Sequence, residues 1–248
     1  MRGAVAVLSD VHGNLTAFEA VLADIVRRGI DTVVNLGDTV GKGPRGSACV
    51  ALARERCAVT VQGNWDEWLG GEPLRLRGDD QAMQAAVRWW HAELAAADRA
   101  WLRGLPFSAA MRVGGEPVRF VHASTVGVWT RVWEEHSADE AAAFFAPSPR
   151  VEPGPAPAVA CYGDLHAAYE ERTPDGLLVN VGSVGNPLDD PRASYVVLEP
   201  GTTGLVARFE RVEYDVEGEL AVAERLAMPE REPWGRELRE GHYRGLGD

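Results

Sequence analysis

The sequence predicts an α/β protein in which a second, largely antiparallel sheet packs on a first, parallel sheet, with helices outside. Over the first half, short apolar runs alternate with amphipathic helical patterns, which is typical of parallel strands joined by helices. Over the second half, apolar runs follow one another across short turns, which is typical of antiparallel strands. The chain has 248 residues and is 46% hydrophobic, so it can bury a sizeable core.

Capping and turn residues bound the elements of the first half. Asn14 is a suitable N-cap for the first helix, because its side chain can accept hydrogen bonds from free amide groups at the helix start. Gly29 is a suitable C-cap, because glycine tolerates the left-handed conformation. The sequence predicts strands at 4–8, 32–36 and 57–61, and helices at 14–28, 45–55, 80–95 and 98–103.

The second half contains a hairpin signal and a proline-rich connector. Gly114-Gly115 separates two strand-like runs and indicates a β-hairpin. Residues 147–157 are rich in proline and indicate a surface loop, and the polar tail from Pro229 is expected to form a short helix and then to fray. We expect strands at 108–113, 117–121, 158–162, 167–172, 177–180, 194–199 and 205–212, and helices at 216–227 and 234–240.

Composition excludes several classes of protein. The formal net charge of −12 argues against a general nucleic-acid surface. No apolar run approaches the roughly 20 residues of a membrane span, and the N-terminus leads almost directly into a strand, so no secretory segment is indicated. Cys49, Cys57 and Cys161 form no CxxC pair or disulfide framework. We expect a soluble, cytoplasmic protein without a membrane partner, and a homo-oligomer stays open.

Side chains of metal-ligand type follow five of the strand-like runs. The carboxyl ends of strands are where open α/β sheets place their chemistry. Taken singly, each residue has a structural explanation, such as a helix cap or a hydrogen-bonded histidine. Together, at strand ends, they indicate one site for divalent metals, since carboxylate, amide and imidazole groups are ligands of such ions. The residues are Asp10, His12, Asp38, Asn64, His122 and His166.

These residues, in this order, resemble the calcineurin-like metallophosphoesterase family. Its pattern is DxH, GD, GNH[DE], a strand ending in GH or VH, and GHxH. Residues 180–187, NVGSVGNP, look like the NPGSVGxP segment of the smaller bacterial branch, which includes phosphodiesterase-like proteins and relatives that cleave dinucleoside polyphosphates. The matching motifs are Asp10-x-His12, Gly37-Asp38, Gly63-Asn64-Trp65-Asp66, Val121-His122 and Gly163-Asp164-Leu165-His166.

The resemblance implies a fold and a metal centre. The fold would be one α/β/β/α sandwich domain of two mixed sheets over residues 1–248, with a C-terminal tail from about 229. A hydroxide bridging two divalent ions would attack phosphorus in line, with Asp38, Asn64 and His122 as catalytic residues. Asp10, His12, Asp38 and His166 would hold the first metal, and Asp38, Asn64, His122 and Asp164 the second.

Two residues depart from the family pattern. Trp65 replaces the histidine of GNH, and tryptophan cannot transfer a proton at neutral pH, so a slower enzyme or a preference for activated esters is expected. Asp164 replaces the first histidine of GHxH. A third carboxylate lowers the net charge of the metal centre, and its harder oxygen favours Mn²⁺, with Fe, Mg, Ni, Co or Zn as the other candidates.

Several further residues are candidates for substrate contacts. Arg131 and Arg45 are expected on loops near the site, where either could contact phosphate. Trp129 and Trp133 are four residues apart and would share one face of a helix. That helix is either a packed surface helix or a lid whose aromatic side chains meet a base or aryl group. The substrate-binding residues predicted from the resemblance are Asn64, His122, Trp65 and Arg131.

The leading prediction is a metal-dependent phosphoesterase that acts on a nucleotide-type or other small phosphate ester, with diesters preferred to monoesters. The alternative is a weakly active or inactive metal-binding or scaffold protein, because the same fold includes a retromer subunit that serves as an interaction module. Loss of catalytic function would allow the two family histidines to be replaced, as they are here by Trp65 and Asp164. The presence of the remaining ligand set argues for the enzyme.

Overall fold

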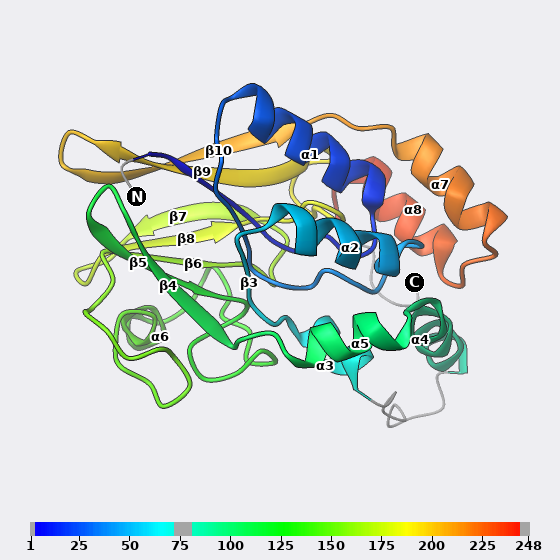
Figure 1. The fold of residues 1–248 in the computed structure, drawn as a ribbon, viewed down its shortest axis with the longest axis horizontal. Helices are drawn as coiled ribbons and strands as arrows, with labels where there is room; N and C mark the ends of the chain where they lie inside the picture. Colours follow the sequence, from blue (N-terminus) through cyan, green and yellow to red (C-terminus); the bar gives the residue numbers. More distant parts are fainter. Residues whose placement is uncertain (1–2, 72–80, 244–248) are drawn as a thin grey trace.

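The computed structural model describes residues 3–71 and 81–243. Two five-stranded sheets pack face to face, and helices cover both outer faces (Figure 1). The predicted α/β/β/α sandwich of two mixed sheets is confirmed. The helices are α1 (Leu15–Arg27), α2 (Gly46–Arg56), α3 (Asn64–Gly70), α4 (Gln81–Glu93), α5 (Ala96–Arg103), α6 (Ala138–Ala143), α7 (Val216–Arg225) and α8 (Arg231–Glu240).

The first sheet combines strands from both ends of the chain. Its order is β10-β9-β1-β2-β3, and β1, β2 and β3 run parallel as predicted, while β9 is antiparallel to both β1 and β10. The strands are β1 (Val5–Leu8), β2 (Val33–Asn35), β3 (Val59–Thr60), β9 (Ala193–Gly201) and β10 (Gly204–Val212).

The second sheet has the order β4-β5-β6-β8-β7 and is less antiparallel than predicted. The expected hairpin joins β4 to β5, but β6 runs parallel to both β5 and β8. The expectation was wrong because of the path of the chain after β6. The chain first forms β7 at the edge of the sheet, and β8 then lies between β7 and β6, antiparallel to β7 and parallel to β6. The strands are β4 (Ser108–Val113), β5 (Glu116–Val121), β6 (Val159–Tyr162), β7 (Ala168–Arg172) and β8 (Leu177–Val181).

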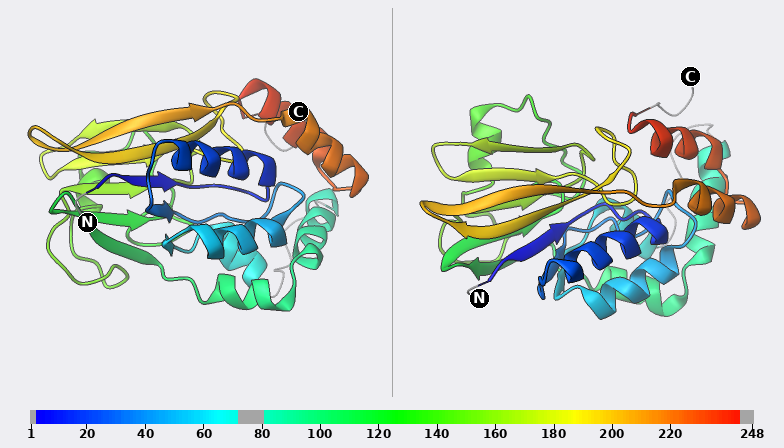
Figure 2. Two further views of the ribbon diagram at one scale, coloured as in Figure 1. Left: turned by 45° about the horizontal axis from the view of Figure 1, so that its top comes forward. Right: turned by 90° about the horizontal axis from the view of Figure 1, so that it is seen from above.

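Three apolar layers hold the sandwich together. Val7 of β1 and Phe120 of β5 belong to a buried cluster between the two sheets. Phe18 of α1 packs with the outer face of the first sheet. Phe144, beside α6, stacks on Tyr162 of the second sheet, with ring centroids 4.8 Å apart. The two further views of Figure 2 show α7 and α8 together at one end of the molecule.

The helix after β1 forms for the predicted reasons, whereas two short helices were not predicted. The Asn14 side chain accepts from the Ala17 amide at 3.1 Å, and Gly29 has a φ of 69° just beyond the helix. The unpredicted helices, α3 and α6, have seven and six residues, too few for a periodic apolar pattern. Residues 129–133 form a loop, so the expected helix there is wrong.

The helices described in 3–71 and 81–243 include none with the length and apolar character that crossing a membrane requires. Residues 244–248, where the tail was expected to fray, and residue 80, the start of one expected helix, lie outside the described residues.

Candidate metal centre

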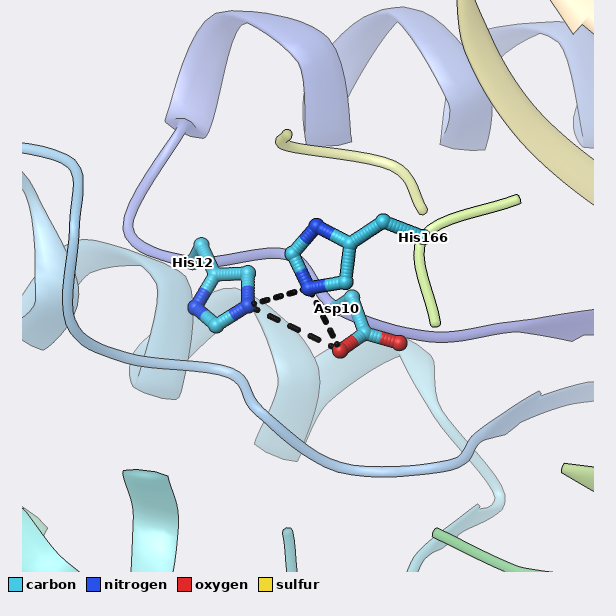
Figure 3. A group of neighbouring side chains, drawn as sticks. All are labelled: Asp10, His12 and His166. Carbon is cyan, nitrogen blue, oxygen red and sulfur yellow. Dashed lines mark hydrogen bonds and ion pairs between the residues drawn. The ribbon is translucent and has the colours of Figure 1, made fainter. Parts of the chain in front are cut away.

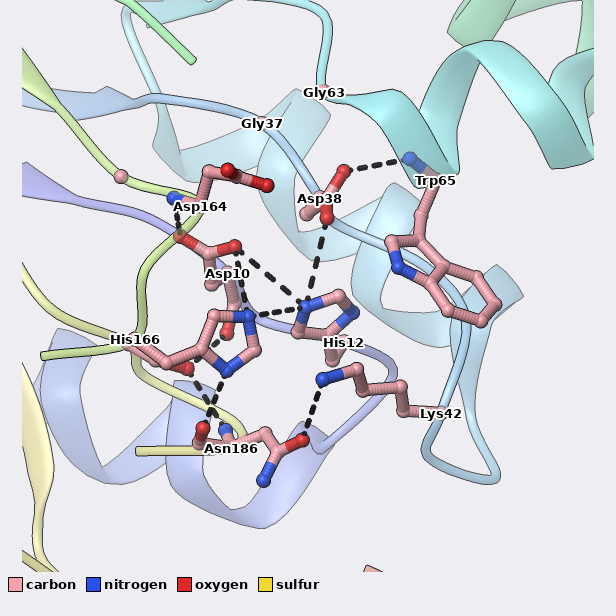
Figure 4. Close-up of polar contacts among 12 residues, drawn as sticks. Asp10, His12, Gly37, Asp38, Lys42, Gly63, Trp65, Asp164, His166 and Asn186 are labelled. Carbon is pink, nitrogen blue, oxygen red and sulfur yellow. Dashed lines mark hydrogen bonds and ion pairs between the residues drawn. The ribbon is translucent and has the colours of Figure 1, made fainter. Parts of the chain in front are cut away.

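The loops that leave β1, β2, β3, β5 and β6 carry the predicted ligands, and Figure 4 shows side chains from several of these loops pointing toward one another. Each of these loops carries one or two of the predicted ligands, and none of those side chains is more than 7% exposed. The structure therefore brings together residues that lie as much as 156 positions apart in the chain. They are Asp10, His12, Asp38, Asn64, His122, Asp164 and His166.

One half of the centre is a triad of Asp10, His12 and His166 (Figure 3). The two imidazoles approach through their Nε2 atoms, which are 3.0 Å apart. The Oδ1 atom of Asp10 is 3.2 Å from Nε2 of His166 and 3.6 Å from Nε2 of His12. Three donor atoms from two distant segments of the chain thus converge on one point.

Backbone carbonyls fix the orientation of both histidine rings in this triad. Nδ1–H of His12 donates to the carbonyl of Val40 at 3.2 Å, and Nδ1–H of His166 donates to the carbonyl of Asn186 at 2.5 Å. Each ring thus directs its Nε2 atom toward the triad. Burial lowers the pKa of His12 to about 3, so this ring is neutral near pH 7. The unprotonated Nε2 atom of His12 is therefore available as a metal ligand.

The second half of the centre lies around His122. Its Nδ1–H donates to the carbonyl of Leu36 at 2.9 Å, which directs Nε2 into the site. That Nε2 atom is 3.0 Å from Oδ1 of Asn64, 3.5 Å from Oδ1 of Asp38 and 3.8 Å from Oδ1 of Asp164. The second predicted ligand set is therefore assembled as well.

Asp38 lies between the two halves. Its Oδ2 atom is 3.6 Å from Nε2 of His12, and its Oδ1 atom is 3.5 Å from Nε2 of His122. One carboxylate oxygen faces each histidine, which is the arrangement that a bridging ligand requires. The Oδ1 atom also accepts from the Trp65 amide at 2.8 Å, which limits rotation of the carboxylate.

Burial and crowding of the carboxylates shift the pKa values of this centre. Burial raises the pKa of Asp38 well above its usual value, because the buried carboxylate cannot be hydrated. Burial opposes protonation of His122, but the nearby carboxylates of Asp38, Asp10, Asp164 and Asp66 outweigh it and raise the pKa of His122 to about 9. Excess negative charge in a buried site is the electrostatic condition that favours bound cations.

The backbone at this centre is strained. Positive φ angles are uncommon in residues other than glycine, cost about 1–3 kcal/mol each and concentrate at functional sites. Glycine at position 163 permits the close approach of this backbone to the triad, because a Cβ there would lie 2.5 Å from Oδ2 of Asp10. The strained ligands are Asp10 (φ 56°), His12 (φ 49°), Asp38 (φ 52°), Asp164 (φ 65°) and His166 (φ 62°).

Two groups support the ligands: Asp66, which had no assigned role in the sequence prediction, and Ser183, which was expected in a structural turn near His166. The carboxylate of Asp66 accepts from the amides of Asp38 at 2.8 Å, Thr39 at 2.9 Å and Gly63 at 3.0 Å, and so joins the loops after β2 and β3. Burial raises the pKa of Asp66 to about 6. The turn after β8 holds the first loop, because Ser183 donates to the carbonyl of Asp10 at 2.8 Å. Both residues lie within motifs that resemble those of the family, and this was the signal in the sequence that could have identified them.

A model of the calcineurin-like phosphoesterase superfamily domain matches residues 4–203. The chain belongs to this superfamily. Membership in this superfamily implies hydrolase activity of the metallophosphoesterase type, as the sequence resemblance did.

Relatives of this calcineurin-like phosphoesterase match over nearly its full length. The crystal structure of a metallophosphoesterase from Sphaerobacter thermophilus is 30% identical, with a TM-score of 0.75, and the match covers 96% of this chain and 98% of that chain. The crystal structure of hypothetical protein PH1004 from Pyrococcus horikoshii OT3 is 19% identical with a TM-score of 0.77, over 98% and 99% of the two chains. Uncharacterized protein MJ0912 from Methanocaldococcus jannaschii is 29% identical over 255 residues, which are 93% of this chain and 96% of that protein.

Asp164 has an arginine as a partner in addition to the other predicted ligands. Arg131 donates from Nε to Oδ2 of Asp164 at 2.7 Å and from Nη2 to Oδ1 at 3.1 Å. The hydrogen bond that Arg131 donates to Asp164 raises the pKa of the Arg131 guanidinium, which therefore stays charged. Arg131 thus lies at the site as predicted, and its charge offsets that of the unusual aspartate.

A cavity of about 520 Å³ opens beside the ligands of this phosphoesterase. Trp65 lies at its edge with its ring against His12, at 6.0 Å between ring centroids and nearly perpendicular. Lys42 also lines the cavity, and its ammonium donates to Oδ1 of Asn186 at 2.9 Å. Burial lowers the pKa of Lys42. Lysine at this position carried no signal in the sequence beyond being the single lysine of the chain.

Arg45 does not reach the site. It lies at the start of α2, donates to Oγ1 of Thr16 at 2.7 Å and forms an ion pair with the buried Glu219 of α7. The expected contact between Arg45 and phosphate is therefore wrong. The side chain joins α1, α2 and α7 because a fully buried carboxylate requires a charged partner.

Proposed function

We propose that this chain is a binuclear metal-dependent phosphoesterase that prefers phosphodiesters and acts on small, nucleotide-type or related esters. The observation that carries the proposal is the convergence of Asp10, His12 and His166, in which the Nε2 atoms of two buried imidazoles lie 3.0 Å apart and Oδ1 of Asp10 lies 3.2 Å from one of them. A buried group of two imidazole nitrogens and one carboxylate oxygen is a suitable set of ligands for a metal ion.

The proposed ligand sets follow the two halves of the centre. Asp38 contributes to both sets, and each imidazole is oriented by a backbone carbonyl. Divalent ions bound here would polarise the phosphoryl group and make water nucleophilic at neutral pH. Asp10, His12, Asp38 and His166 would hold the first ion, and Asp38, Asn64, His122 and Asp164 the second.

The remaining proposed work of the protein is to position and neutralise the ester. Arg131 is held by Asp164 and lines the cavity, so its guanidinium can also donate to a phosphate oxygen. The amide of Asn64 and the ring of His122, which lie 3.0 Å apart at the second half of the centre, would act as further catalytic and substrate-binding groups. Trp65 offers no transferable proton at neutral pH, which favours esters with good leaving groups.

Charge supports the preference for diesters and for manganese. Three carboxylates, Asp10, Asp38 and Asp164, leave two divalent ions with a net charge of about +1, which suits a monoanionic diester better than a dianionic monoester. Carboxylate and amide oxygens together with imidazoles suit Mn²⁺, and Fe, Mg, Ni, Co and Zn stay as alternatives. Metal analysis after reconstitution in a mixture of these ions tests the choice, and tight zinc in both positions would contradict it.

Hydrolysis and metal content test the proposed function together. Purified protein with Mn²⁺ is expected to hydrolyse bis-p-nitrophenyl phosphate faster than p-nitrophenyl phosphate. Asp38→Ala should lower turnover by at least about 100-fold, since even groups behind a metal ligand are worth 10–100-fold. Asp175→Ala, which alters an exposed acid in the turn between β7 and β8, is the matched control and should keep its activity.

An inactive metal-binding scaffold is the competing function. Bound metal without turnover of either ester would favour a metal-binding scaffold. Absence of both metal and turnover would overturn the proposal.

Trp65→His measures what the missing histidine costs. A histidine at this position would border the cavity and restore a side chain that can protonate a leaving group. We expect a gain of about 10-fold or more for alkyl esters and little change for p-nitrophenyl esters, whose leaving group needs no proton. An equal change for both ester types would show that Trp65 acts only through packing.

We also infer one domain over residues 1–248, with the region from about 229 as an appended tail, and a cytoplasmic location. The family model matches residues 4–203, and α8 packs against α7 rather than standing apart. All three cysteines are unpaired thiols, which suits a reducing compartment. Limited proteolysis tests the domain, because cleavage into two stable halves would contradict it.

A further inference from the structure

We propose that the cavity beside the metal centre binds a flat aromatic group of the phosphate ester, and that Trp133 determines this preference. The inference rests on the proposed function, because the phosphate itself would lie at the metal centre. It names a class of substrate, esters that carry one aryl or nucleobase ring system, and a residue that selects it.

Aromatic side chains from four parts of the fold meet around this cavity. They come from α3, α4, the loop between β5 and α6, and α8, so the wall is assembled only in the folded chain. A volume of about 520 Å³ lies within the usual range for small-molecule sites. The tryptophans that line it are Trp65, Trp90, Trp133 and Trp234.

The cavity has charged side chains in two places, which are the metal centre and the carboxylates of Glu230 and Glu237 at α8. Asp164 and His166 line it, together with Lys42 and Arg131. Met83, Leu188 and other apolar side chains contribute to the remaining wall together with the tryptophans. A ligand with an anionic end and an apolar, flat end would therefore find a matching surface for each.

Trp133 connects these two parts of the wall. The guanidinium carbon of Arg131 lies 5.1 Å from the centroid of the Trp133 ring, and the same guanidinium is fixed by Asp164. The ring is 58% exposed, so a ligand could still cover much of it. Stacking on an aromatic side chain is sequence-tolerant for bases and stronger for flat rings than for alkyl groups.

Trp129 provides an internal contrast. It lies on the same loop and is 56% exposed, almost as much as Trp133, but it does not line the cavity. Its indole N–H donates instead to Oε2 of Glu67 at 2.6 Å. The two residues thus match in type, exposure and chain position and differ in their access to the cavity.

Calorimetric titration of the Mn²⁺-loaded protein with phosphonates, whose C–P bond is not hydrolysed, tests the inference without requiring turnover. Phenylphosphonate should bind at least about 10-fold more tightly than methylphosphonate. A second pair, 9-(2-phosphonomethoxyethyl)adenine and the same phosphonate without adenine, distinguishes a nucleobase from a simple aryl group. The pair with the larger ratio of affinities, ring-bearing over ring-free phosphonate, identifies the ring that the cavity prefers.

Two variants assign the preference to one residue. Trp133→Ala should reduce the ratio between ring-bearing and ring-free phosphonates at least about 5-fold, and Trp133→Phe should restore most of it. Trp129→Ala should leave the ratio unchanged. Loss of the Arg131 contact would weaken both members of a pair alike, so the ratio reports the ring alone.

The outcomes separate the inference from the function beneath it. Equal binding of both members in each pair, or an equal loss in the Trp129→Ala and Trp133→Ala variants, would overturn the aromatic site while leaving the phosphoesterase proposal intact. Failure of every phosphonate to bind would overturn the proposed anion site at the metals and the inference with it. A ring preference without ester hydrolysis would support the aromatic site and contradict only the catalytic proposal.

Discussion

The two halves of the metal centre differ in what their ligands contact within the protein. In the first half, donor atoms of Asp10, His12 and His166 face one another, and Oδ1 of Asp10 has no hydrogen-bond partner among the described residues. In the second half, Asp164 already has a bidentate partner in Arg131. The first half is thus an incomplete cluster, whereas the second is partly neutralised by the protein's own cation.

Because the two halves differ in this way, we expect the two ions to bind with different affinities. An ion entering the first half meets the neutral ring of His12 and the Oδ1 atom of Asp10, which has no hydrogen-bond partner among the described residues. An ion entering the second half must share Asp164 with Arg131 and displace the proton that the carboxylates hold on His122. We therefore expect stepwise binding, with the first half filled at the lower metal concentration.

The largest expected effect comes from comparing Asp10→Asn with Asp164→Asn. Asp10 faces both histidines of the first half, and its carboxylate also lies within 4.8 Å of donor atoms of Asp38 and His122, so its replacement should lower Mn²⁺ affinity and turnover by at least about 100-fold. Asp164→Asn should reduce only the affinity for the second ion. Metal content after dialysis and initial rates measure both effects. Equal losses in the two variants would show that the halves are equivalent.

Proton release should distinguish the halves next. His12 is neutral, with a pKa of about 3, but the metal-free His122 has a pKa of about 9 and is protonated at pH 7. Because a bound ion requires the neutral imidazole, affinity for the second ion should rise about 10-fold per pH unit between pH 6 and 8. Calorimetry in buffers of different ionisation enthalpy should detect about one proton released by His122 with the second ion.

The same pKa has a consequence for the stability of the metal-free protein. Since the folded-state pKa of His122 lies above its unfolded value, its stabilising contribution is complete below about pH 6.5 and is lost as the pH rises through about 9. In the presence of a chelator, thermal unfolding should therefore occur at lower temperature at pH 9.5 than at pH 7. A His122→Asn variant lacks this titrating group and should show a smaller decrease.

The smallest expected effect concerns Arg131. Arg131→Met removes the cation that competes for Asp164, so affinity for the second ion should rise by about 10-fold while the affinity for phenylphosphonate falls. Arg150→Met is a matched control, because Arg150 is an exposed arginine whose guanidinium lies over Phe107. Weaker binding of the second ion in Arg131→Met would mean that Arg131 orients Asp164 for the metal.

Much of the centre could be predicted because its ligands follow strands in recognisable motifs. Asp10 and His12 directly follow β1, and parallel strands bring such ends to one edge. The sequence could not tell Trp133 from Trp129, because their assignment depended on a helix that does not form. The prediction that Arg45 contacts phosphate was wrong for a similar reason, because its partner Glu219 is 174 residues away in the chain.

Three features of this protein follow from the sequence alone. They are the buried strands, the capped helix after Asn14, and the types of ligand that follow the strands. These depend on interactions between neighbours in the chain, which a residue pattern records directly. Only the tertiary structure decided that Arg131 neutralises Asp164 and that α8 brings Trp234 to the cavity. Such contacts depend on how distant elements pack, and the pattern within a single segment carries no information about its partner across the fold.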